Sequence, residues 1–152
     1  GQLTYSANWD HFEPVPFWDL LDVVGVTAYV QLSAADAPTD AELDAGWRGF
    51  RQQLRRLALR TGKPYLLTEV GYPAHPDGAK RPWDYRPTGT PDPALQARCY
   101  RSLVRTWHAD ERLAGVYIWN WFGVGGPEDR GYSPRDREAA QVLRHWYSGS
   151  RP

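Results

Sequence analysis

Glu69 is the residue whose type and position are most suited to chemistry. It follows the apolar residues Tyr65, Leu66 and Leu67 and stands near the end of a segment that resembles a buried strand. A carboxylate in such a segment is energetically unfavourable unless it is paired or has a function. Two interpretations stay open from the residues alone. Glu69 is a reactive carboxylate, or one of the sixteen arginines pairs with it and its role is structural.

Aromatic and amide side chains end the other apolar segments of the chain. These residues are Asn8 and Trp9 after the first segment, Tyr29 in the second, and Trp119, Asn120 and Trp121 in the last. Trp and Tyr are abundant, with 8 and 9 copies, and both offer a flat apolar face together with a hydrogen-bonding group. Such a ring can form the floor on which a sugar stacks, although any one of these residues can equally belong to the core.

Other kinds of chemistry find no support in the sequence. The histidines at positions 11, 75, 108 and 145 lack the spacing of metal ligands, and no nucleophile-elbow or phosphate-binding motif is present. Cys99 is the only cysteine, and its place on the apolar side of a helical pattern predicts a core residue. We therefore expect neither a metal site nor a cofactor.

Length and composition fit one globular domain over residues 1–152. Hydrophobic residues make up 41% of the chain and charged residues 24%, which is typical of globular proteins. Lys and Arg together number 18, as do Asp and Glu, and this zero net charge argues against a nucleic-acid partner. No apolar run approaches the roughly 20 residues that cross a bilayer, so we expect no membrane partner.

Strand-like and helical segments alternate along the chain. Strand-like apolar runs lie at 3–8, 23–30, 64–71 and 115–122. The last three are rich in Val, Ile, Leu and aromatic residues, as expected for parallel strands buried on both faces. The expected helices are a short one near 17–21, one after Thr39 with Glu42 completing a capping box, one from Asp92-Pro93 and one from Ser133-Pro134. This order predicts an α/β fold of four β/α units.

Four units match one half of a (β/α)8 TIM barrel, because a full barrel takes about 250 residues. The polar segments after the strands are long, whereas turns before the strands, such as 61–63, are short. Barrels with a site at the carboxyl ends of their strands show this asymmetry. A doubly wound four-stranded sheet is the rival fold, but no glycine-rich phosphate turn follows the first strand.

An ordered series of motifs resembles the carboxyl-terminal half of glycoside hydrolase family 113, bacterial β-mannanase-like enzymes of clan A with a (β/α)8 fold. The motifs are Thr4–Trp9, Gly25–Tyr29, Lys63–Pro64 with Thr68–Tyr72, Pro82–Tyr85 and Gly131–Pro134. The resemblance implies that the four strands are strands 5 to 8 of the family barrel. It also implies a retaining reaction on β-1,4-mannan or related oligosaccharides, with glutamates at the ends of strands 4 and 7.

The resemblance also implies roles for individual residues. Glu69 becomes the catalytic nucleophile, and Trp119 becomes the aromatic residue under the sugar at the cleavage site. The remaining substrate-binding residues would be Asn8, Trp9, Tyr29 and Trp83. Thr27 departs from the family pattern, in which an acidic residue is expected. No glutamate of the chain takes the strand-4 acid/base position, so we expect the isolated chain to be inactive without an amino-terminal half.

Two functions of different classes remain. The chain is the nucleophile-bearing part of a retaining β-glycosidase, or it is a non-catalytic carbohydrate-binding or scaffold half-barrel. In both cases the expected partners are a β-linked oligo- or polysaccharide and either an amino-terminal half-barrel or a second copy. A half-barrel leaves two strand edges and the inward faces of its strands open. We expect apolar residues on that open face, namely Val24, Val26, Leu67 and Ile118.

Overall fold

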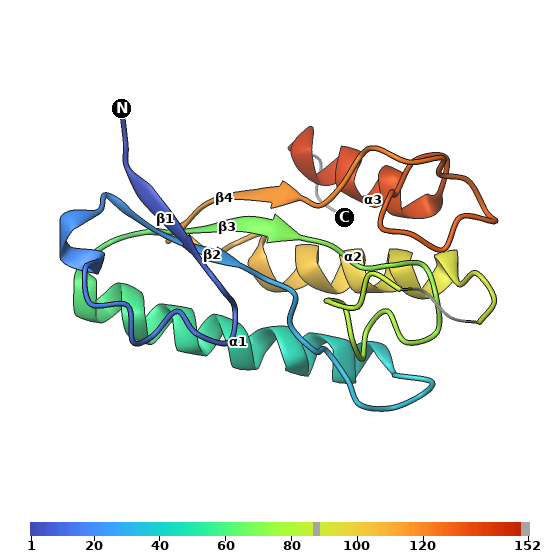
Figure 1. The fold of residues 1–152 in the computed structure, drawn as a ribbon, viewed down its shortest axis with the longest axis horizontal. Coiled ribbons are helices and arrows are strands. Elements are labelled where there is room, and N and C mark those ends of the chain that lie inside the picture. Colours follow the sequence, from blue (N-terminus) through green and yellow to red (C-terminus); the bar gives the residue numbers. More distant parts are fainter. Residues whose placement is uncertain (87–88, 150–152) are drawn as a thin grey trace.

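A parallel sheet with helices packed on one side forms the fold of the computed structural model, which describes residues 1–86 and 89–149 (Figure 1). Its strands are β1 (Thr4–Ala7), β2 (Val23–Thr27), β3 (Tyr65–Val70) and β4 (Leu113–Ile118). They lie in the order β1-β2-β3-β4, and each neighbouring pair is parallel. This order confirms the predicted (β/α)4 half-barrel. A doubly wound sheet would instead reverse its strand order.

The helices of the described residues are η1 (Trp18–Leu20), which is a 3-10 turn, and the α-helices α1 (Asp40–Thr61), α2 (Pro93–Trp107) and α3 (Glu138–Tyr147). The predicted capping box begins α1. The Thr39 amide donates to Glu42 Oε2 at 2.6 Å, and the Glu42 amide donates to Thr39 Oγ1 at 3.3 Å. Gly62 ends the helix with a φ of 72°, a conformation that glycine adopts without steric cost.

Helix α3 and strand β4 differ most from the elements expected. Helix α3 begins at Glu138 rather than at Ser133-Pro134, because Asp136 has a φ of 56° that no right-handed helix can include. Strand β4 begins at Leu113 and ends at Ile118, before the aromatic residues that follow it. The chain from 119 to 137 is therefore one long loop at the carboxyl end of β4.

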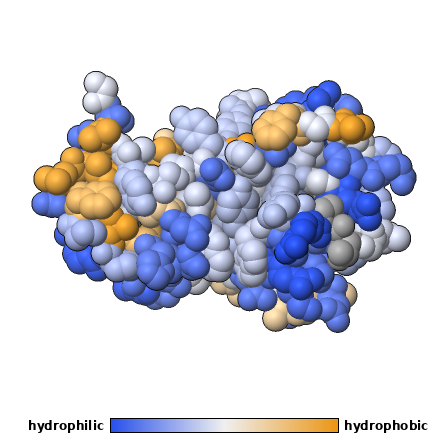
Figure 2. Space-filling view, viewed as in Figure 1, coloured by the Kyte–Doolittle hydropathy of each residue, from blue (hydrophilic) through white to orange (hydrophobic). Residues whose placement is uncertain are grey.

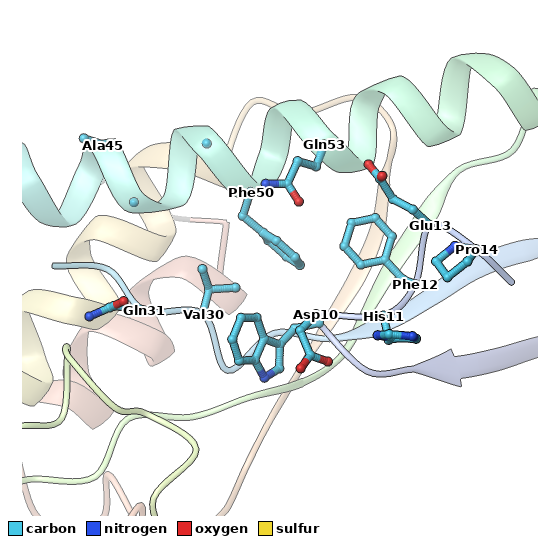
Figure 3. A pocket seen from close by; sticks show the side chains of 13 residues that line it. Asp10, His11, Phe12, Glu13, Pro14, Val30, Gln31, Ala45, Phe50 and Gln53 are labelled. Atoms are coloured by element: carbon cyan, nitrogen blue, oxygen red, sulfur yellow. The ribbon is translucent and has the colours of Figure 1, made fainter. Parts of the chain in front are cut away.

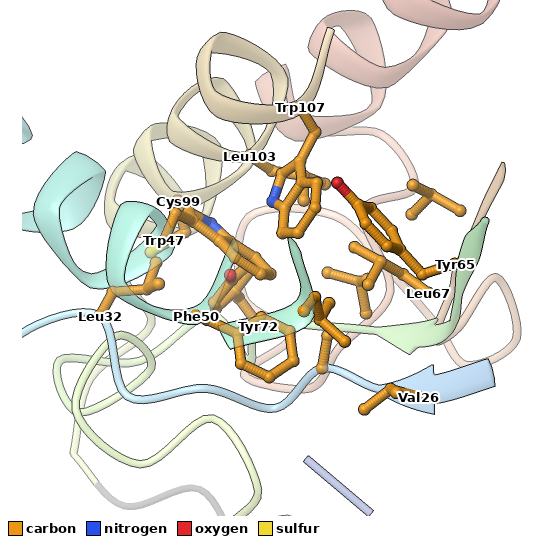
Figure 4. Packing of buried hydrophobic residues seen from close by; sticks show 14 of the residues in the cluster. Val26, Leu32, Trp47, Phe50, Tyr65, Leu67, Tyr72, Cys99, Leu103 and Trp107 are labelled. Carbon is orange, nitrogen blue, oxygen red and sulfur yellow. The ribbon is translucent and has the colours of Figure 1, made fainter. Parts of the chain in front are cut away.

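The hydrophobic core fills the space between the sheet and the helices (Figure 4). The indole of Trp47 in α1 meets that of Trp107 in α2 edge to face, with ring centroids 5.7 Å apart. Cys99 of α2 is fully buried in this core, as its position in the helical pattern predicted. Burial raises the pKa of the Cys99 thiol, so the group is an inert part of the packing.

The expected apolar residues of the open sheet face are misassigned. Val24, Val26 and Leu67 are buried against the helices, and Ile118 packs partly on the same core. The helices cover only one face of the sheet, so the apolar residues of these short strands turn toward that face.

The uncovered face of the sheet carries polar groups on both sides of Gly25. On it, the hydroxyl oxygens of Ser6 in β1 and Thr68 in β3 lie 2.5 Å apart. They meet across Gly25 of β2, where an added Cβ would lie 2.6 Å from Thr4 Oγ1. Gly25 therefore leaves room for polar groups from both neighbouring strands to meet above β2.

Strands β1 and β4 are the two edges of the sheet, each paired on one side only. Hydrophobic side chains gather at the end of the molecule where β1 and η1 lie (Figure 2). Within the described residues, no helix has the length and apolar character needed to cross a membrane.

Candidate active site

Glu69 lies at the carboxyl end of β3, where the sheet pairing is irregular. Its Cα partner in β2 is Thr27, and the register of β3 with β4 shifts between Leu67 and Val70. Leu67 and Val70 are both buried, so two successive residues between them, Thr68 and Glu69, avoid the helix-facing core. An irregularity of this kind re-aims a side chain at the end of a strand.

Tyr29 holds one oxygen of the Glu69 carboxylate. The Tyr29 hydroxyl donates to Glu69 Oε2 at 2.7 Å. Burial, together with the adjacent carboxylate, raises the pKa of Tyr29 far above its ordinary value, so this phenol remains a neutral donor. None of the salt bridges among the described residues involves Glu69. Its partner is therefore a tyrosine, and the arginine-paired interpretation has no support.

Trp119 follows strand β4, the neighbour of β3 in the sheet. Its amide donates to the carbonyl of Val70 at 2.8 Å, which ties it to the residue after Glu69. The indole is 40% exposed and is available for contact. Gly71 permits the approach of the two strand ends, because a Cβ there would lie 2.2 Å from the carbonyl oxygen of Trp119.

Asn8 lies directly after β1, and both the oxygen and the nitrogen of its side-chain amide are hydrogen-bonded. Thr27 Oγ1 donates to Asn8 Oδ1 at 3.1 Å, and Asn8 Nδ2 donates to Asp10 Oδ1 at 2.6 Å. These bonds fix the orientation of the amide. Because Thr27 is also the register partner of Glu69, residues 8, 27 and 69 form a row across three strand ends.

Trp9 and Trp83 come from different loops and stack on each other. Their ring centroids are 5.2 Å apart with an interplanar angle of 22°. Trp83 belongs to the loop after β3, and its outer part is exposed. The sequence identified each of them as a candidate binding residue, but nothing in it predicted that the two rings would touch.

Two further residues of this rim were missed. Asp10 orients Asn8, and the only sign of it in the sequence is its position two residues after a strand end. Tyr132, from the loop after β4, packs its ring edge-on against Tyr29 with centroids 6.2 Å apart. Its hydroxyl donates to the carbonyl of Pro82 at 2.5 Å, so it supports the loop that carries Trp83. Tyr132 lies within one of the motifs that carry the family resemblance, which is the signal that marks it.

The six predicted site residues thus all lie at the carboxyl ends of the strands. Tyr29 and Glu69 are in direct contact with each other, Trp119 follows the adjacent strand, and the indoles of Trp9 and Trp83 are paired. The described residues contain no group of three His, Cys, Asp or Glu side chains that could hold a metal ion. A carboxylate with one oxygen held, and indoles at the same ends of the strands, are suited to a neutral polyhydroxylated substrate.

Comparison with known proteins identifies a family. The model of Glycoside Hydrolase Family 113 matches residues 1–135. A search of curated proteins found no significant match. Among solved structures, a GH113 β-1,4-mannanase complex superimposes with a TM-score of 0.84 at 19% identity, covering 97% of this chain and 46% of that one.

Two other solved structures extend this comparison. The GH113 β-mannanase AaManA from Alicyclobacillus acidocaldarius, in complex with ManMIm, gives a TM-score of 0.81 at 27% identity, with coverages of 97% and 45%. A Faecalibacterium prausnitzii β-glucuronidase gives 0.64 at 19% identity, with coverages of 97% and 25%. The chain therefore spans about half the length of the mannanases that it matches.

Proposed function

The chain belongs to glycoside hydrolase family 113, and we propose that it supplies the nucleophile of a retaining β-glycosidase that acts on β-1,4-mannan or related oligosaccharides. The observation that carries this proposal is the Glu69 carboxylate, held by Tyr29 at 2.7 Å at the carboxyl end of β3. In barrel enzymes this end of the strands is where catalytic residues stand.

The two oxygens of the Glu69 carboxylate have different roles in the proposed reaction. Tyr29 donates to Oε2, which leaves Oε1 free to attack the anomeric carbon of a bound sugar. The new bond joins Oε1 to that carbon while the glycosidic carbon–oxygen bond breaks and its electron pair leaves with the aglycone oxygen. Water then attacks the anomeric carbon, gives a proton to the group that acted as acid in the first step, and releases the carboxylate, so that two inversions give net retention.

The leaving oxygen needs a proton, and the proposal assigns that acid to a different half of the barrel. A retaining site requires a second carboxyl group about 5–5.5 Å from the nucleophile. The chain spans about half of each family 113 structure it matches, and β1 and β4 are unpaired edges. An amino-terminal half-barrel that pairs with these edges would bring the acid to the free side of Glu69.

Trp119 gives the site its affinity for sugar. Its exposed indole follows the strand next to Glu69 and offers an apolar face to the C–H groups of a pyranose ring. Trp9, Trp83 and Asn8 lie at the same ends of the strands, where they would contact further units of the chain.

An activated substrate tests the nucleophile in a step that needs no acid. A dinitrophenyl 2-deoxy-2-fluoro-β-mannoside carries a leaving group that departs without protonation, and its fluorine slows the release of the adduct. We expect mass spectrometry to find one fluoroglycosyl group on Glu69 when the chain is combined with the amino-terminal half of a family 113 mannanase. The Glu69→Gln variant should stay unlabelled.

Hydrolysis of β-1,4-mannan by the same mixture tests the whole reaction. Glu69→Gln should lower the rate by far more than tenfold and leave substrate binding nearly unchanged, because it removes only the nucleophile. A Glu69→Gln variant that keeps a tenth of the rate contradicts the assignment. Binding of mannan oligosaccharides with neither labelling nor hydrolysis would establish the alternative, a non-catalytic carbohydrate-binding half-barrel.

A further inference from the structure

A pocket of about 490 Å³ lies between the loop after β1 and the first half of α1 (Figure 3). Its volume falls in the range of small-molecule sites. Figure 3 shows Phe50 and Gln53 reaching from α1 toward the loop that carries Asp10 and Phe12. The pocket lies beside the row of residues 8, 27 and 69 rather than within it, since none of those three lines it.

The walls of this pocket are held in place by the fold. Phe12 is buried and meets Phe50 edge to face at 5.7 Å, and its carbonyl accepts the Trp18 indole N–H at 2.9 Å. On the opposite side, α1 packs closely on the chain after β2, because a Cβ on Gly46 would lie 2.4 Å from the carbonyl oxygen of Leu32. The cavity is therefore preformed, which lowers the entropic cost of binding.

The polar side chains around the pocket have unused hydrogen-bonding capacity. In the described part of the chain, the side chains of His11, Glu13, Gln31 and Gln53 form no hydrogen bond or salt bridge. Together they offer one carboxylate acceptor, one imidazole and two amide groups that both donate and accept. Neither lysine nor arginine lines the pocket, and the carboxylates of Asp10 and Glu13 disfavour an anionic ligand.

Trp9 links the pocket to the proposed active site. It lines the cavity, and its ring is also stacked on Trp83. An aromatic side chain combined with amides and carboxylates, without a cation, matches the needs of a neutral sugar, which presents both C–H faces and hydroxyl groups.

We propose that this pocket binds a neutral hexose unit of the glycan, at a position separate from the cleavage site and joined to it through Trp9. The proposal rests on the proposed function for the kind of sugar, but its location follows from the pocket alone. It assigns a binding role to Gln31 and Gln53, two residues that the catalytic arrangement does not use.

Side-chain amide signals in NMR spectra of the chain test the proposal. Titration with β-1,4-mannobiose should shift the signals of Gln31 and Gln53 with a saturable dependence on sugar concentration. A hexuronic acid at neutral pH should leave them unshifted, because Asp10 and Glu13 repel it.

A filling substitution and a matched control locate the binding. Gly49 lines the pocket on α1, and a Cβ there would meet no atom within 4 Å, so Gly49→Leu can begin a side chain at the pocket wall without overlap at its first atom. We expect it to weaken mannobiose binding at the amide signals at least tenfold. Gln52→Leu adds a similar apolar surface to the same helix outside the lining and should leave binding unchanged.

The outcomes separate this proposal from the proposed function. Pocket shifts that survive Gly49→Leu, or no shifts of Gln31 and Gln53, overturn the pocket proposal. Labelling of Glu69 by the activated fluoroglycoside, together with unmoved pocket signals, leaves the proposed function standing alone. Pocket binding that Gly49→Leu abolishes, with no labelling of Glu69, supports the hexose site and contradicts the nucleophile.

Discussion

Tyr29, which follows β2, donates a 2.7 Å hydrogen bond from its phenol to the carboxylate of Glu69 at the end of the neighbouring strand β3. A phenol that donates to one carboxylate oxygen holds the group in place and leaves the other oxygen free. In a nucleophile this matters, because the attacking oxygen must be correctly aimed before it attacks.

Tyr29→Phe should therefore slow the labelling of Glu69 without preventing it. The bond positions the attacking carboxylate, and loss of such positioning should lower the rate roughly 10- to 100-fold. The measurement is the labelling rate with the activated fluoroglycoside, and Tyr85→Phe, which changes an exposed phenol, is the control. An unchanged rate for Tyr29→Phe would show that the bond has no part in catalysis.

The pH dependence follows from the same contact. The raised pKa keeps Tyr29 protonated above about pH 10, where free tyrosine ionises. A group whose pKa is higher in the folded state adds stability that is complete below the unfolded pKa and is lost as the pH rises beyond it. The labelling rate should therefore show no loss from Tyr29 ionisation up to about pH 10. A fall between about pH 7 and 9 in the ratio of the parent's labelling rate to that of Tyr29→Phe would contradict this.

Trp119→Ala should weaken the binding of manno-oligosaccharides about tenfold, because the sugar loses an apolar face on which to stack. The matched comparison is Trp121→Ala, which removes an indole of similar exposure, 45% against 40%, two residues further along the chain. Isothermal titration on the complete barrel with Glu69→Gln measures binding without turnover. An equal loss of oligosaccharide affinity in both variants would contradict a specific sugar-stacking role for Trp119.

Much of this site was accessible from the sequence, and the physical reasons are visible in particular residues. Glu69 stood out because a carboxylate in an apolar strand is costly, and the cap at Thr39 and the stop at Gly62 located α1 because both act over a few neighbouring residues. The contact of Trp9 with Trp83 depends instead on two loops that meet in space, for which no local pattern exists.

The orientation of the strands was the main error. Alternation alone does not say which face of a strand meets the helices, and the irregular pairing of β2 with β3 and of β3 with β4 interrupts the alternation further. Val26 and Leu67 therefore lie in the core rather than on the open face. The polar pair of Ser6 and Thr68 takes the open face because Gly25 between them has no side chain.

Gly71→Ala should destabilise the protein, because the new methyl group would displace the backbone of Trp119. The added methyl would lie 2.2 Å from the carbonyl oxygen of Trp119, and relieving such an overlap typically costs about 1–3 kcal/mol. Gly49→Ala is the matched control, since its methyl enters open space on a helix and should stabilise the fold by about 0.5–1 kcal/mol. Thermal unfolding measures both, and a Gly71→Ala protein as stable as the parent would contradict the close approach.

Association of the chain should proceed through the edge at β1 rather than through an apolar inner face. Leu3 and Leu20 are 60% and 75% exposed beside this unpaired edge, whereas the open face carries hydroxyl groups. Exposed apolar residues beside an unpaired strand promote pairing with another chain, and lysine at such positions opposes it.

We expect sedimentation velocity to show concentration-dependent association of the parent chain, reduced in the Leu3→Lys, Leu20→Lys double variant. Val124→Lys, at an 86% exposed position in the loop after β4, should associate like the parent. A parent chain that stays monomeric at all concentrations, or a double variant that associates equally well, would show that the β1 edge does not drive pairing.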